Sequence, residues 1–123
     1  MAVDAKIIVP SGSSNGKPIA ITSTSGTGQT IHTATSTADE VDVIELFASN
    51  ESSNDETLTL QIGGTTDYTN TMKVELKALG NIGQDGAIPL GTFTLSGGEV
   101  LRAIADTTNT VKVWGNVRRI TNA

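Results

Sequence analysis

The sequence predicts an all-β fold, an antiparallel β-sandwich of the jelly-roll kind with about eight strands. Short runs of alternating apolar and polar residues recur along the chain, as in 58–62 and 72–78. This period of two is typical of half-buried strands. Each run is closed by a cluster of Gly, Asn, Asp or Ser, the residues that favour turns. The runs come at fairly even spacing with no convincing helix between them, which favours a sandwich or a barrel.

The first segment, residues 1–28, differs from the rest of the chain. It holds Gly, Ser and Thr tracts around two short apolar stretches, Ile7–Val9 and Ile19–Ile21. Such tracts bury too little apolar surface to offset the entropy lost on ordering. We therefore expect an extended N-terminal arm over residues 1–28 and a β-sandwich domain over residues 29–123. The alternative is an ordinary edge strand with long loops.

Regular strands are predicted from residue 29 on, first over residues 29–35 and then over residues 40–50. In the second of these the apolar residues change face between Val43 and Ile44, which predicts a β-bulge there. A helix over residues 38–48 is the competing interpretation, because some apolar residues lie near helical spacing. The β-branched residues and the turn that follows favour the strand.

The remaining strands are separated by turns. The turn at residues 50–56 is predicted to close a hairpin between residues 40–50 and a strand over residues 57–62. Further strands are predicted over residues 72–78, 88–95, 99–106 and 111–120. Gly115 interrupts the last strand, which predicts a bulge or a close backbone approach. Because several neighbours look hairpin-linked, a simple meander is the alternative to the jelly roll.

The composition excludes several classes of protein. A chain of 123 residues fits a single domain. The absence of cysteine removes disulfides, thiol catalysis and cysteine metal sites, and favours folding in a reducing cytoplasm. The net charge of -5 argues against nucleic-acid binding. We expect no membrane association, because no apolar run reaches the roughly 20 residues that span a bilayer and the start of the chain lacks a secretory signal.

No catalytic constellation is visible. His32 is the only histidine, and it falls on the opposite strand face from Ile31, so we expect a surface residue and not a catalytic base. The chain shows no GxSxG nucleophile elbow, the sharp strand-to-helix turn that exposes a catalytic serine. Neither glycine-rich segment, 26–30 or 62–66, matches a phosphate-binding P-loop. We expect no enzyme activity and no cofactor.

Acidic residues form two clusters, over residues 39–45 and residues 51–56. Oxygen-rich clusters can hold calcium, but neither cluster has the spacing of an EF-hand loop. Glu40 and Asp42 share one face of their strand, which resembles a solvated edge. We therefore expect no metal site.

The aromatic and basic residues are few. Aromatics make up 3% of the chain, which argues against a groove that stacks sugars or bases. Trp114 is the only tryptophan, and we expect it to anchor the core or a subunit interface. Arg118 and Arg119 are adjacent and so face opposite ways on a strand. One of them can therefore enter an interface with an acidic neighbour.

Two blocks, residues 43–66 and 88–120, resemble small β-sandwich virion proteins of tailed bacteriophages, in particular the decoration or cement proteins of capsids. The resemblance rests on the strand pattern, the Gly-Gly after a strand, the SGGEVLRA segment and the closing GNVRRI. It implies a homotrimer or other small oligomer on the capsid surface of the virion, made in the host cytoplasm. Such a protein bridges neighbouring subunits of the major capsid protein and stabilises the shell.

Decoration proteins commonly grip coat subunits with an extended arm, a role that maps to residues 6–21 here. Such an arm can add a strand to the exposed sheet edge of a neighbour. The apolar side chains expected to enter pockets on the partner are Ile7, Ile8, Val9, Ile19 and Ile21. The alternative function is a carbohydrate- or receptor-binding module of a phage fibre or tail accessory protein, with its site near Tyr68 or Trp114.

Overall fold

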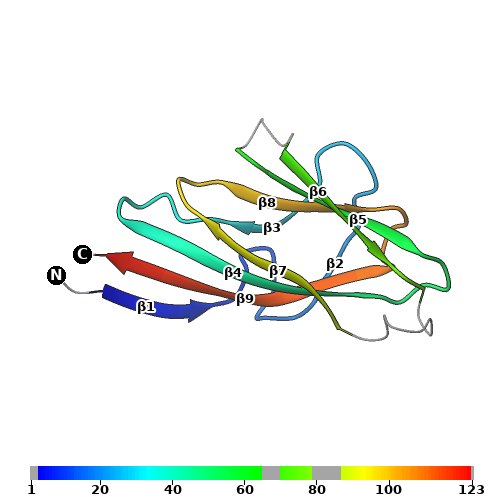
Figure 1. Ribbon diagram of the computed structural model, residues 1–123, viewed down its shortest axis with the longest axis horizontal. Coiled ribbons are helices and arrows are strands. Elements are labelled where there is room, and N and C mark those ends of the chain that lie inside the picture. The colour runs from blue at the N-terminus through cyan, green and yellow to red at the C-terminus, as the bar shows by residue number, and fades with distance from the viewer. Residues whose placement is uncertain (1–2, 65–69, 79–86, 123) are drawn as a thin grey trace.

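The structure is a computed structural model that describes residues 3–64, 70–78 and 87–122. Its strands are β1 (Val3–Ile8), β2 (Ile19–Ala20), β3 (Gln29–Thr33), β4 (Glu40–Asn50), β5 (Glu56–Gly63), β6 (Asn70–Leu76), β7 (Ile88–Leu95), β8 (Val100–Ala105) and β9 (Val111–Asn122). None of the described residues lies in a helix. The strands form two antiparallel sheets packed against each other (Figure 1), which confirms the predicted all-β sandwich.

The strand order is that of a jelly roll. Sheet A has the order β1-β9-β4-β7, with the short β2 also paired to β9, and sheet B has the order β3-β8-β5-β6. From β2 on, the chain passes to the other sheet at every connection except the one between β5 and β6. This winding excludes the simple meander. The expected hairpin between residues 40–50 and 57–62 is wrong, because the turn between β4 and β5 carries the chain from sheet A to sheet B.

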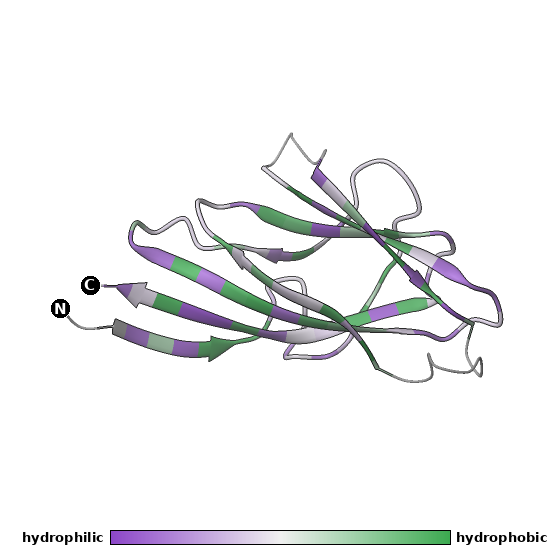
Figure 2. Cartoon of the chain, viewed as in Figure 1, coloured by the Kyte–Doolittle hydropathy of each residue, from purple (hydrophilic) through white to green (hydrophobic). Residues whose placement is uncertain are grey.

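One face of β4 points into the core and the other points out of the sandwich. Ile44, Leu46 and Ala48 are fully buried, whereas Glu45 is exposed and Phe47 is half-buried. Figure 2 shows the corresponding alternation of polar and apolar residues along β4. This is the period of two from which the strand was expected.

The bulge predicted at Val43–Ile44 is wrong. β4 keeps an unbroken register with β9 along its whole length. Asp42 lies in phase with the buried Ile44 and is itself completely buried, so the inward face continues through the expected slip. The register of β4 shifts instead between Leu46 and Phe47, on the side that pairs with β7.

Aliphatic side chains from both sheets fill the core. Its buried members are Ile19, Ile21, Ile31, Ile44, Leu46, Ala48, Leu58, Leu60, Leu76, Leu101, Ala103, Ala105, Val111, Val113 and Val117. Phe93 packs against them and is only partly buried. Branched side chains of this kind interdigitate well between two sheets about 10 Å apart.

The described part of residues 1–28 lies on the sandwich. β1 pairs with β9 at the edge of sheet A, and β2 pairs with the same strand further along. Ile19 and Ile21 are buried in the core. The Ile21 N–H donates to the Val111 carbonyl at 2.9 Å, and the Ile21 carbonyl accepts from the Asn109 N–H at 2.9 Å. The expected arm is therefore corrected to the alternative, an edge strand with long loops, because the isoleucines leave water for the core.

Gly115 marks a close approach between β9 and β4. A Cβ atom at this position would collide with the carbonyl oxygen of Glu45. The register between the two strands is unbroken there. Of the two features expected at Gly115, the close backbone approach is therefore confirmed and the bulge is wrong.

Candidate functional site

A buried ionic network crosses the sandwich near the end where Val3 and Asn122 pair, the end marked N and C in Figure 1. Its centre is Asp42 on β4, which has no exposed surface. Arg119 on β9 binds both carboxylate oxygens, with Nε 2.8 Å from Oδ1 and Nη2 2.9 Å from Oδ2. His32 on β3 places Nε2 2.7 Å from Oδ2. The network therefore joins one strand of sheet B to two strands of sheet A.

The carboxyl group of Asp42 is held in its charged form. Burial raises its pKa, but the hydrogen bonds from Arg119, His32 and the Thr35 N–H, together with the charge of Arg119, lower the pKa by more, from 3.8 to about 2. The Thr35 N–H donates to Oδ2 at 3.0 Å. A buried charge is tolerated when it is paired and fully hydrogen-bonded, and it becomes costly when one partner is removed. The charged state of Asp42 therefore depends on all three of its partners.

Glu40 extends the network toward the surface. Its Oε2 accepts from the Thr121 hydroxyl at 2.6 Å, and its Oε1 accepts from the Thr35 hydroxyl. These hydrogen bonds, first that from Thr121, lower the pKa of Glu40. Arg119 Nε lies 3.8 Å from Oε1, so the guanidinium sits between two carboxylates. The hydrogen bond to Asp42, followed by the charges of both acids, raises the pKa of Arg119.

His32 is paired like a catalytic histidine, but both of its ring nitrogens are occupied. Nδ1 accepts the Ser11 N–H at 3.0 Å, so the ring proton lies on Nε2 and is donated to Asp42. The Ser11 hydroxyl instead accepts the Thr33 N–H at 2.7 Å. A Ser-His-Asp triad requires the hydroxyl on the imidazole, and His32 is only 1% exposed. Ser11, His32 and Asp42 therefore form a cross-link within the fold.

The expected surface position of His32 and the expected solvated edge at Asp42 are both wrong. A register shift between Thr30 and His32 leaves Ile31 and His32 buried together, although they are neighbours on one strand. Asp42 precedes Ile44 by two residues and so continues a buried strand face. That phase relation was the available signal, because a charge on a buried face needs a partner.

The second acidic cluster binds groups within the chain. Glu56 is buried and accepts from the Thr107 N–H at 2.9 Å and from the Thr110 hydroxyl at 2.9 Å, which fixes the turn between β8 and β9. Glu51 pairs with Lys112 on β9. Within the described ranges, no three His, Cys, Asp or Glu side chains are grouped so that they could hold a metal ion.

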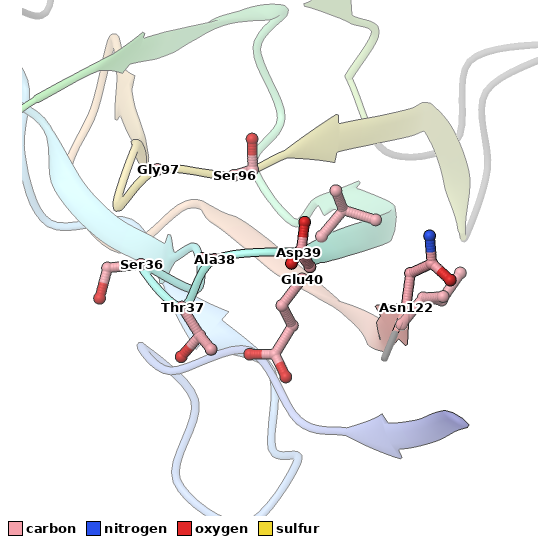
Figure 3. A pocket seen from close by; sticks show the side chains of 10 residues that line it. Ser36, Thr37, Ala38, Asp39, Glu40, Ser96, Gly97 and Asn122 are labelled. Atoms are coloured by element: carbon pink, nitrogen blue, oxygen red, sulfur yellow. The ribbon is translucent and has the colours of Figure 1, made fainter. Parts of the chain in front are cut away.

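An open pocket of about 440 Å³ lies beside the network (Figure 3). It is bounded by the connection from β3 to β4, the turn between β7 and β8 and the end of β9. Ser36, Thr37 and Asp39 contribute hydroxyl and carboxylate groups to its lining, and Ile120 contributes an apolar side chain. Glu40 also lines the pocket, but its carboxylate is already bonded within the network. The pocket thus offers a ligand a largely apolar lining with a few hydroxyl groups, one carboxylate and one amide.

Trp114 lies on the outer face of sheet A. It stacks on Phe47 of β4, with ring centroids 6.3 Å apart and ring planes at 25°. The two residues are directly opposite each other in the register of β4 and β9, and both are half-buried. Of the two roles expected for Trp114, the core is excluded and the interface anchor stays a prediction. Tyr68 lies outside the described residues.

The five apolar residues expected to bind a partner fall into two groups. Ile19 and Ile21 are part of the core, so their expected role in partner binding is corrected: their side chains already pack against this chain. Ile8 is partly buried against the same core. Ile7 is 77% exposed and Val9 is 46% exposed. Of the five, only these last two are exposed enough to contact a partner with much of the side chain.

Comparisons with protein-family models, with curated proteins and with solved structures give no match. A search of the described residues for a helix long and apolar enough to cross a membrane finds none. The function is therefore inferred from the residues and their geometry.

Proposed function

We propose that the protein is a structural virion protein of the capsid-decoration type. It binds neighbouring subunits of the major capsid protein on the outside of the shell and stabilises their contacts. The observation that carries this proposal is the exposure of Ile7 and Val9 on and just after the edge strand β1. Large apolar side chains exposed together at a sheet edge favour a protein partner that covers them.

The edge strand also offers its backbone. One side of β1 pairs with β9, and in the described part of the chain no strand pairs with its other side. A strand of a coat subunit can therefore extend sheet A beyond β1, with Ile7 entering a pocket on that subunit. Because a shell repeats the same site many times, each contact can be weak and still hold the shell together.

The fold and the sequence support the same proposal. Jelly rolls recur in viral capsid and lectin domains, although a fold does not fix a function. The resemblance of residues 43–66 and 88–120 to decoration proteins covers β5, β7 and β8 and most of β4 and β9. A closed oligomer of such a protein presents the same edge to several coat subunits at once.

Capsids prepared without the protein provide the test. They should bind added protein and should then disassemble at a higher temperature than bare capsids. The double substitution Ile7→Ser and Val9→Ser should weaken capsid binding about tenfold or more without changing the stability of the free protein. Met72→Ser is the matched control, because Met72 is 41% exposed on β6 of the other sheet.

Two results count against the proposal in different ways. Unchanged binding of the double variant would remove the role of β1. Absence of the protein from purified virions would remove the capsid function itself. Deleting residues 1–28 is the poorer experiment, because it also removes Ile19 and Ile21 from the core.

The stacked pair of Phe47 and Trp114 favours a second candidate, a carbohydrate-binding module. Half-exposed aromatic faces on a sheet are surfaces on which sugar rings can stack. Because Trp114 is the only tryptophan, its fluorescence reports directly on this site. Titration with a panel of glycans should change the emission if the pair binds sugar, and an unchanged spectrum throughout the panel would exclude this site.

A further inference from the structure

The outer face of sheet A carries apolar residues at both ends of the paired strands β4 and β9. Phe47 and Trp114 form one end, and Val41 lies opposite Ile120 at the other. Ile7 of β1 reaches the same face beside β9 and is the most exposed large apolar residue described, at 77%. The face therefore carries apolar residues at both ends and on β1, with polar residues between them, and it crosses several strands.

An acid and a base lie between the two apolar ends. Glu45 of β4 and Arg118 of β9 line a depression of about 170 Å³ together with Ile7, Val43, Thr92 and Asn116. In the part of the chain that the structure describes, the side chains of Glu45 and Arg118 form no hydrogen bond or ion pair. The Glu45 carboxylate can therefore still accept hydrogen bonds and the Arg118 guanidinium can still donate them, on a face whose two ends are apolar.

The charge of this face does not oppose the approach of a second copy. Two cations and one anion, Lys112, Arg118 and Glu45, give the face a net charge of +1, whereas the chain as a whole carries -5. Lys112 is already paired with Glu51. The charges that remain are one acid and one base, which is the set that a self-complementary contact requires.

We propose that two copies of the chain associate through the outer face of sheet A about a two-fold axis, with Glu45 of each copy paired to Arg118 of the other. The axis lies in the plane between the two faces and crosses β4 and β9 between Arg118 and Glu45. Rotation about it reverses the strand direction. Phe47 and Trp114 of one copy then cover the apolar end of the other, and both ion pairs form at once.

The size of the face sets the strength of the contact. Four strands spaced by about 4.8 Å, and about 20 Å of strand from Val41 to Phe47, give roughly 400 Å² on each copy. A standard interface takes about 800 Å² from each partner. The dimer is therefore a weak one, with a dissociation constant on the order of 10 μM. This association does not depend on the proposed capsid role.

Sedimentation equilibrium over about 1–500 μM protein is the test, since this range brackets the expected dissociation constant. The unaltered chain should pass from monomer to dimer. Arg118→Glu and Glu45→Arg should each weaken association about tenfold or more, because like charges then face each other in both pairs. An equal mixture of the two variants should dimerise again, because both pairs regain opposite charges. The double variant carrying both changes should also recover.

Lys73→Glu is the matched control. Lys73 is exposed on β6 of sheet B, and its substitution changes the net charge by the same amount as Arg118→Glu. It should leave the dimer unchanged. A monomer at every concentration, a trimer, or a mixture of variants that stays monomeric would overturn the two-fold contact. Capsid binding by a monomer would support the proposed function and overturn the dimer. A dimer that does not bind capsids would support the dimer and overturn the proposed function.

Discussion

Asp42 is charged and has no exposed surface, so its contribution to stability depends on groups that lie far from it in the sequence. Arg119 is 77 residues away and supplies two of its hydrogen bonds. His32 and the Thr35 N–H supply the others. The carboxylate thus holds three strands and one connection in a fixed relation at one end of the sandwich.

Replacing Arg119 should destabilise the protein strongly. Arg119→Met removes the guanidinium and leaves the Asp42 carboxylate buried without its cation, which lowers the free energy of unfolding by about 3–5 kcal/mol. Arg118→Met is the control, because Arg118 is the adjacent residue and points out of the sandwich. It should change the free energy of unfolding by less than about 0.5 kcal/mol. Urea unfolding at low micromolar protein measures both, and equal effects would contradict the importance of the network.

Acid should weaken the protein through Asp42. The pKa of this carboxyl group falls from 3.8 to about 2 on folding. Its contribution to the free energy of unfolding is therefore present above about pH 4 and is lost as the pH falls toward 2. The shift corresponds to about 2 kcal/mol. Between about pH 5 and pH 2 the free energy of unfolding should therefore fall by about 2 kcal/mol more in the unaltered chain than in Asp42→Asn. Parallel pH profiles of the two proteins would refute this.

At the scale of elements, the N-terminal segment is fixed at several points. The Gly12 N–H donates to the Ile31 carbonyl at 2.9 Å, and Ser11 bonds to β3 through both its N–H and its hydroxyl. β2 then adds two residues to the edge of sheet A. The segment is rich in Gly and Ser, and this composition alone favours an unattached arm. The burial of two isoleucines, Ile19 and Ile21, stabilises the attached segment by more than this composition disfavours it.

Serine substitutions distinguish this arrangement from a free arm. Ile21→Ser removes a fully buried side chain and places a hydroxyl in the core, so it should lower the free energy of unfolding by about 2–4 kcal/mol. Ile7→Ser changes a largely exposed position and should cost less than about 0.5 kcal/mol. Thermal and urea unfolding measure both. Small effects at both positions would show that the segment is detached in solution.

At the scale of the whole molecule, the sequence predicts the class of fold because its signal is local. Alternation and turn residues define each strand by itself, as in Met72 to Ala78. The sheet to which a strand belongs depends on contacts between distant segments. The turn at 51–55 suits a hairpin and a crossover equally, so its residues could not tell which of them forms. The jelly roll was expected only as one of two topologies, and the pairing of the strands decides between them.

The candidate site was less accessible to sequence analysis. The phase of Asp42 with Ile44 could be read from the sequence, whereas its pairing with Arg119 could not. The inward turn of His32 depends on a register shift in β3 that has no marker in QTIHTAT. The sequence could not predict that Ile7 is exposed and Ile21 is buried either, because both lie in short apolar stretches flanked by similar residues.

Cooperative unfolding of the whole described chain is expected. Residues 10–21 share the core and the hydrogen bonds of β9 and β3, so they should not open before the sheets do. In native-state hydrogen exchange, the amide of Ile21 should be protected to a similar degree as that of Val113 in the centre of β9. Exchange of Ile21 within seconds, with Val113 still protected, would contradict this arrangement.

The pairing of Val3 with Asn122 has a mechanical consequence. β1 and β9 run antiparallel as immediate neighbours, and β1 begins at the margin of the sheet where β9 ends (Figure 1). Tension applied between Val3 and Asn122 therefore opens the ladder of β1 and β9 from that margin, and the pairs of hydrogen-bonded residues bear the load one after another. Resistance to such a pull is low even in a protein that resists heat and denaturant. A covalent link between Val3 and Asn122 removes this route of rupture, so the mode of attachment determines the tensile strength of the domain.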